Sequence, residues 1–223
     1  MIEFYESLSQ NIKASLIVIT GLIIFLSIIG HKVSKLDVRD KPKGIVFLMI
    51  LLIDVLNNFI KDFYGRHWKT FAPILIAIFL YLAFANTASI FGLAAPLANI
   101  RIALSFSLIA FLTIQVSGMM VRKPWNRIKD LSSPTPLLLP LNLVSELSTP
   151  LAMGLRLFGN LLSGSVMAAV VFNLMNWTGS VVITTILLHP VFNLGFGLIQ
   201  AFVFFMLLTI FLSMAIEEPE VAA

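Results

Sequence analysis

Long apolar runs, separated by short polar connections, are the main pattern along this chain of 223 residues. Three runs have the length of an ordinary membrane helix, at residues 14–30, 70–93 and 100–121. A perpendicular membrane helix needs about 20 residues, so each of these runs predicts one crossing. Two further runs, at 138–176 and 180–216, are too long for one crossing each and too short for two. We expect them to be steeply tilted helices that form an oblique hairpin in the membrane.

The apolar run at residues 45–60 differs because polar side chains lie along one of its faces. It is also slightly short for a membrane span. It contains the polar residues Asp54, Asn57 and Asn58, and their spacing places them on one face of a helix together with the following Lys61. Basic connections flank the run on both sides, which favours the cytoplasm for both of its ends. We therefore predict an interfacial helix that does not cross the membrane; a strained short span is the alternative.

Composition agrees with a single integral membrane domain over residues 1–223, in an all-α fold of about five to six helices. Hydrophobic residues make up 59% of the chain and charged residues 12%, which leaves no room for a large extramembrane domain. Of the 15 Lys and Arg residues, 12 lie in connections at 31–43, 61–69 and 122–129. This clustering argues for cytoplasmic loops next to membrane lipid, and against nucleic acid as a partner. We expect the N-terminus outside and the C-terminus in the cytoplasm.

The N-terminal residues 1–16 are acidic and then polar, without the basic start and small-residue cleavage site of a signal peptide. We therefore expect the first apolar run to be retained. The lack of a transit peptide favours a bacterial plasma membrane, although an organelle-encoded chain in an inner membrane would look alike. The chain has no cysteine, which excludes disulfides and thiolate metal sites.

Two charged residues, Glu146 and Arg156, interrupt the long apolar run at 138–176. A charge at the centre of a bilayer costs about 2.5–3.5 kcal/mol on insertion scales, so such residues are functional by default. Arg156 does not lose its proton near neutral pH, and it therefore has to face a polar partner or water. Glu146 could be a candidate site residue, or only a local structural partner for Arg156 or for nearby Ser and Thr.

Polar residues form a line along the predicted helix at 138–176. At roughly 100° per residue, five of them lie within about 40° of one another: Asn142, Thr149, Arg156, Asn160 and Ser163. Ser165 points to the opposite side, and Glu146 lies about 80° from the line. Pro150 removes one backbone donor, so we expect a bend before Arg156.

On the run at 180–216, three polar residues share one face of an α-helix: His189, Asn193 and Gln200. Pro190, Gly195 and Gly197 soften the helix around this face and allow another helix to approach closely. Polar lines on two neighbouring membrane helices are typical of aqueous paths and proton relays. The alternative is that single Asn, Ser and Thr side chains only form hydrogen bonds between helices, and that His189 is a packing residue.

Patterns of a soluble enzyme site are absent, because the sequence has no phosphate loop, no metal-ligand spacing and no nucleophile–base pair. The residues alone indicate a membrane protein that moves an ion past a buried arginine. A self-contained secondary transporter is the alternative, but we find no internal repeat of the kind it would need. A purely structural membrane subunit is disfavoured by Arg156.

The heptad GLRLFGN at residues 154–160 resembles the signature of the family of subunit a of the F-type ATP synthase. Further motifs similar to those of the family follow in the family's order: KDFY at 61–64, PLAN at 96–99, PLN at 140–142, IQAFVF at 199–204 and EE at 217–218. The resemblance covers most of residues 45 to 218. The heptad together with the glutamine segment is specific, and the N-terminal part is not.

The resemblance implies the stator half of an ion channel that works with a ring of c subunits, peripheral-stalk b subunits and other ATP synthase subunits. Two offset aqueous half-channels would reach a carboxyl group on each passing ring subunit. Arg156 would keep that carboxylate ionised, because an opposite charge favours the ionised form, and would prevent leakage between the half-channels. Gln200 would lie opposite Arg156 as its hydrogen-bond partner. No cofactor is implied, and ATP chemistry would belong to other subunits.

Two positions depart from the family's pattern. Many members carry an ionisable residue nine positions after the arginine, where this chain has Ser165, and another seven positions before the glutamine, where it has Asn193. Water held by these two side chains could carry protons, with His189 or Glu146 as the relay and Asn160 beside the arginine. Sodium is the alternative ion, because it needs oxygen ligands rather than titrating groups. We favour protons, since the ring's own carboxyl site mostly decides the ion.

Overall fold

The computed structural model describes residues 9–36, 42–88, 93, 95–121 and 139–216. Within these ranges the regular structure is helical, and no described residue lies in a β-strand. The predicted all-α fold is therefore confirmed.

The predicted helices are found, with changes of up to four residues at their ends. The exception is the run at 70–93, which corresponds to α4 and whose last part, at 89–92, lies outside the described residues. In chain order they are α2 (Gln10–Ser34), α3 (Ile45–Tyr64), the short η1 (Gly65–His67), α4 (Trp68–Thr87), the short η3 (Pro96–Ala98), α5 (Ile100–Val121), α7 (Leu139–Leu174), α8 (Trp177–Ile183), η5 (Thr184–Phe196) and α9 (Gly197–Ile216). Five described helical segments are long and apolar enough to cross a membrane: α2, α4, α5, α7 and the continuous stretch from α8 to α9. Helix α3 is not among them, and its placement along the membrane surface stays a prediction.

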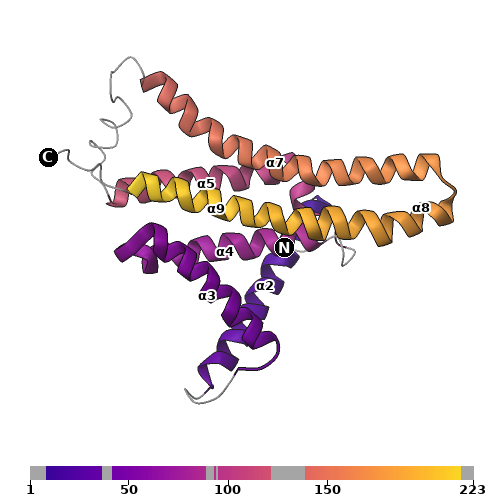
Figure 1. Ribbon diagram of the computed structural model, residues 1–223. Coiled ribbons are helices and arrows are strands. Elements are labelled where there is room, and N and C mark those ends of the chain that lie inside the picture. Colours follow the sequence, from indigo (N-terminus) through magenta and orange to yellow (C-terminus); the bar gives the residue numbers. More distant parts are fainter. Residues whose placement is uncertain (1–8, 37–41, 89–92, 94, 122–138, 217–223) are drawn as a thin grey trace.

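Helix α9 lies at the centre of the molecule, where it packs against α4 on one side and α5 on the other (Figure 1). Six of its side chains have no exposed surface: Ala201, Phe204, Phe205, Leu208, Thr209 and Leu212. From α4, Leu75 and Leu82 are equally enclosed. Because lipid tails are as apolar as these side chains, van der Waals packing and hydrogen bonds between helices hold such a bundle together.

Buried polar side chains reach backbone carbonyls of neighbouring helices in this core. The Asn86 amide on α4 donates a hydrogen bond of 2.8 Å to the carbonyl oxygen of Gly197 on α9. A Cβ added at Gly197 would lie 2.9 Å from the Asn86 Cβ, so the close helix approach predicted at this glycine is confirmed. At Gly195, a Cβ would meet only the Pro190 carbonyl oxygen of its own segment, at 3.6 Å, so the described residues bring no other helix close there. Tyr64, at the end of α3, donates a bond of 2.8 Å to the Thr209 carbonyl. These bonds fix how the helices meet.

Replacing Asn86 by alanine removes its bond to Gly197, and we expect the assembled protein to lose about 0.6–1.7 kcal/mol of stability. Thr87→Ala is the control, since the Thr87 hydroxyl bonds only carbonyls of its own helix, Ala83 at 3.0 Å and Phe84 at 3.2 Å. Thermal unfolding of the detergent-solubilised complex measures both variants. Equal melting temperatures for the two would contradict the assignment.

The two long segments form the predicted hairpin, with α7 lying alongside the arm from α8 to α9 (Figure 1). Helix α7 has 36 residues, and the second arm runs over 40 residues from Trp177 to Ile216. Asn176 caps the second arm, since its side-chain oxygen accepts the Gly179 N–H at 3.1 Å. Pro150 lies inside α7, and the helix changes direction partway along its length. The steep tilt in a membrane stays a prediction.

The second arm is not the uniform α-helix that we expected. Residues Thr184–Phe196 form a π-helix of 13 residues. In a π-helix, each backbone hydrogen bond joins residues five positions apart instead of four. Pro190 lies inside this segment and has no N–H to continue an α-helical ladder. The predicted face of His189, Asn193 and Gln200 assumed α-helical spacing throughout. The first two side chains lie outside the described part, so the shared face stays a prediction.

Candidate functional site

Helix α7 packs against the bundle with only one of its faces. Its fully buried residues recur every three or four positions: Pro150, Met153, Gly154, Leu157 and Leu161. A Cβ at Gly154 would lie 2.7 Å from the Ser107 Cβ on α5, so the two backbones approach closely there. The Ser107 hydroxyl also donates a hydrogen bond to the carbonyl of Pro150. Helix α5 is therefore held tightly against this face of α7.

Arg156 lies on the opposite flank of α7, which the rest of the described chain leaves uncovered. It follows Gly154 by two residues, a rotation of about 200° around the helix. The Arg156 side chain is exposed, and so are the apolar side chains of Leu155 and Leu162. Within the described part of the chain, Arg156 makes no hydrogen bond or ion pair. A permanent cation on an apolar flank has to find its partner elsewhere.

The other members of the predicted polar line do not tie α7 to its neighbours. Thr149 donates to the Ser145 carbonyl at 3.2 Å, and Ser163 donates to the Gly159 carbonyl at 2.8 Å, both within α7. Asn160 is half-buried beside the arginine. Asn142, also half-buried, takes part in a contact of its own. The alternative that these side chains form hydrogen bonds between helices is therefore not supported for Thr149 and Ser163, which bond only within α7.

Ser165 is exposed, and its hydroxyl donates to the Leu162 carbonyl of its own helix at 2.8 Å. Gln200 is buried in the first turn of α9. No hydrogen bond joins Gln200 to Arg156 in the described part of the chain, so the expected pairing of these two residues stays a prediction. The side chains of His189 and Asn193 fall outside that part.

Glu146 faces α5, in agreement with its predicted position about 80° around the helix from the polar line. The Gln115 amide on α5 donates a hydrogen bond of 2.7 Å to one oxygen of the Glu146 carboxylate. Both side chains are half-buried. Sequence analysis did not single out Gln115; the one available signal was a lone amide in an otherwise apolar span.

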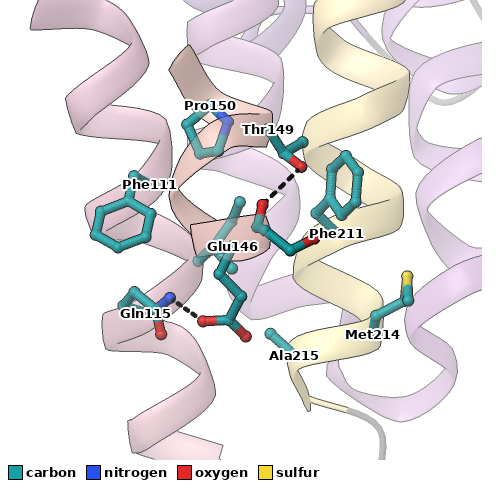
Figure 2. Close-up of a pocket in the computed structure, with 10 residues that line it drawn as sticks. Phe111, Gln115, Glu146, Thr149, Pro150, Phe211, Met214 and Ala215 are labelled. Atoms are coloured by element: carbon teal, nitrogen blue, oxygen red, sulfur yellow. Dashed lines mark hydrogen bonds between the residues drawn. The ribbon is translucent and has the colours of Figure 1, made fainter. Parts of the chain in front are cut away.

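A cavity of about 260 Å³ lies beside this pair, between α5, α7 and the end of α9. Figure 2 shows the Glu146 carboxylate inside it, with Gln115 on one side and Ala215 of α9 on the other. Phe111 and Phe211 supply apolar walls. Since a water molecule takes up about 30 Å³ in the liquid, the cavity has room for several waters next to a carboxylate.

Thr149 connects this cavity with the flank that carries Arg156. It lines the cavity and also belongs to the predicted polar line, seven residues before the arginine. Seven residues correspond to about 10 Å along an α-helix. The described site thus consists of a polar cavity around Glu146 and, roughly two turns away on a different flank, an exposed arginine.

Comparison with known proteins gives a consistent result. The family model described as "ATP synthase A chain" matches residues 14–213. The chain is 28% identical to ATP synthase subunit a 2 of Picosynechococcus sp., in an alignment that covers 97% of this chain and 91% of that protein. It is 25% identical to ATP synthase subunit a of Streptococcus agalactiae, with 92% and 90% covered. With its apolar helices and outward-facing arginine, this chain therefore belongs to the family of subunit a of the F-type ATP synthase, a membrane-sector stator subunit without ATP chemistry of its own.

Proposed function

We propose that this chain supplies two offset aqueous half-channels to the carboxylates of a rotating ring of c subunits. The observation that carries the proposal is the exposed Arg156 on the uncovered flank of α7, without an acidic partner in the described chain. A carboxylate from another membrane subunit is the natural counterpart, because hydrogen bonds between ions of opposite charge are the strong ones. The peripheral-stalk b subunits would hold the chain against the ring.

Arg156 would have two tasks in this arrangement. As each ring carboxyl passes, the nearby guanidinium favours its ionised form, so that the carboxyl releases its ion. The fixed positive charge also repels protons and sodium ions, and so prevents a direct path between the half-channels. The ion then has to travel around on the ring, which converts the ion gradient into rotation.

The cavity beside Glu146 serves as the inner half-channel. Gln115 lies near the end of α5, and the basic connection at 122–129 follows it. Basic connections tend to face the cytoplasm, which supports a cytoplasmic position for this end of α5, the cavity and the C-terminus, and an external N-terminus. Ions would pass between the cytoplasm and the ring along Glu146, Thr149 and Asn160.

The outer half-channel would follow the π-helical part of the second arm. π-helical turns occur frequently at functional sites, and this one contains His189 and Asn193. Ser165 lies on the facing arm of the hairpin, and Gln200 follows in α9. Water held by Ser165 and Asn193, with His189 as the titrating group, would carry protons to the ring. Sodium transport by the same subunit is the alternative.

Single cysteines test whether the cavity is an aqueous path, and the chain offers a background without native cysteine. We expect Thr149→Cys to react with a membrane-impermeant thiol reagent applied to the cytoplasmic side of vesicles that contain the complex. Val116→Cys is the control, since Val116 adjoins Gln115 but is exposed on the outer surface of α5. The thiolate is the reactive form and needs water, so a lipid-facing cysteine stays unlabelled. Equal labelling of both positions would contradict the proposed half-channel.

A further inference from the structure

The part of the second arm from Trp177 to Phe196 buries hydroxyl groups and exposes apolar side chains. Among its described side chains, only Ser180 and Thr184 are buried, with 0% and 6% of their surfaces exposed. Large apolar side chains such as Ile186 are exposed instead. This order is typical of a membrane segment whose polar groups face a neighbouring helix. The two arms of the hairpin therefore meet through polar groups near its tip (Figure 1).

Ser180 connects the two arms. Its hydroxyl lies 3.1 Å from the Val171 carbonyl oxygen in the last turn of α7, and 3.0 Å from the Asn176 carbonyl oxygen between the arms. A hydroxyl has only one hydrogen to donate, so these oxygens keep the capacity to accept from a further donor. Thr184 follows four residues later, one helical turn further along the same face. The inner side of the hairpin is thus polar from its tip to the start of η5.

Thr184 carries a buried hydroxyl that has no hydrogen-bond partner in the described part of the chain. A helical threonine can satisfy its hydroxyl with a carbonyl three or four positions back. Thr209 in α9 does so, with a bond of 2.8 Å to the Phe205 carbonyl. A buried hydroxyl without a partner is costly, and buried polar groups in proteins bond to other protein groups or to ordered water. Water is therefore the natural partner of the Thr184 hydroxyl.

The backbone adds a second polar group at the same place. The Thr184 N–H bonds the Ser180 carbonyl, four positions back, as in an α-helix. From Thr184 onward the segment is π-helical, and its bonds join residues five positions apart. Where the interval grows from four to five, the N–H groups outnumber the carbonyls by one. A buried water needs about two to four polar partners, and the threonine hydroxyl and the surplus N–H supply two of them.

We propose that Thr184 holds a water molecule between the arms of the hairpin, and that this water belongs to the outer half-channel. The inference rests on the proposed half-channels and adds a residue that the family's motifs in this chain do not include. His189 follows Thr184 by five residues, the interval of one π-helical bond, so its backbone lies one turn further along the segment. The water accepts a proton from the outer side and releases another toward His189, and so remains water.

Thr184→Val tests the role, because valine has the same shape and no hydroxyl. A buried hydroxyl without a task is only a cost, so its removal would then leave pumping native. We expect ATP-driven pumping per assembled complex to fall about fivefold, the factor that corresponds to one hydrogen bond. Thr184→Ser keeps the hydroxyl and should pump near the native rate. Thr185→Val is the matched control, since Thr185 is the next residue and is exposed. Native pumping by Thr184→Val would overturn the proposal, and so would an equal loss in Thr184→Ser or Thr185→Val.

The access of water to Thr184 can be measured without pumping. Thr184→Cys places a thiol at this point of a chain without native cysteine. We expect silver ions on the outer side of membrane vesicles to bind this thiol, which then no longer reacts with a maleimide after denaturation. The thiolate is the form that binds metal and it needs water, so the thiol of Thr185→Cys, among exposed apolar side chains, should stay reactive. A thiol at Thr184→Cys that stays equally reactive would overturn the proposal.

Arg156→Ala, run beside these variants, tests the rotary mechanism independently of Thr184. If it abolishes pumping while Thr184→Val pumps at the native rate, the half-channels stand and only the role of Thr184 fails.

Discussion

ATP-driven ion pumping falls at least about a hundredfold when Arg156 is replaced by alanine, while the complex still assembles. The expected size of the effect follows from the position of the residue. A guanidinium beside a carboxyl group lowers the carboxyl pKa by about 1–3 units, and each unit is a factor of ten in ionisation. In the proposed mechanism, loss of that charge leaves the ion on the ring carboxyl and also removes the barrier between the half-channels. Assembly survives because Arg156 makes no bond within the described chain.

Acidification of inverted vesicles in sodium-free buffer measures this loss, with co-purification of the c subunits as the check on assembly. Arg101→Ala is the matched control, since Arg101 is also an exposed arginine in an apolar helix but lies in the first turn of α5. At a helix end, a long arginine side chain can extend to the membrane surface. We expect the control to pump normally. If Arg156→Ala pumped normally as well, the arginine would be structural and the rotary mechanism would lose its main support.

Hydrophobic patterning predicted the helices well because membrane spans depend on length and apolar content, both of which are local properties. The run at 100–121 corresponds to α5 residue for residue, and the run at 138–176 to α7 within two residues at each end. The π-helical segment at 184–196 was not foreseen. Pro190 predicts a weak point in the helix, but how far the changed backbone bonding extends depends on the packing of neighbouring helices.

The candidate site was predictable only in part. Arg156 could be identified from the energetic cost of a charge in lipid, without any knowledge of the fold. That it faces outward could not, because α7 is apolar on several sides and its buried face is selected by contact with α5. The bond between Gln115 and Glu146 joins residues that are 31 positions apart in sequence, and it depends on the relative register of two helices. No periodicity within one helix contains that information.

The largest expected structural effect concerns Gly154, the first residue of the heptad that contains the arginine. A Cβ at this position would lie 2.7 Å from the Ser107 Cβ and 3.1 Å from the Ala103 carbonyl oxygen. Neither atom can swing aside like the end of a long side chain, so Gly154→Ala has to push α5 and α7 apart. Overpacking of this kind costs about 1–3 kcal/mol, more than the roughly 1 kcal/mol that alanine gains over glycine in a helix. We expect lower thermal stability and pumping reduced severalfold.

Two further variants determine whether that contact is the cause. Gly21→Ala in α2 is the control, because a Cβ there meets no atom within 4 Å, and we expect it to behave like the native protein. Adding Ser107→Gly to Gly154→Ala removes the closest clash and should recover part of the stability and of the pumping. Stability and pumping have to recover together, since the spacing of α5 and α7 sets both the packing and the reach of Gln115 to Glu146. A native-like Gly154→Ala, or a double variant no better than the single one, would show that the helices do not meet as closely as described.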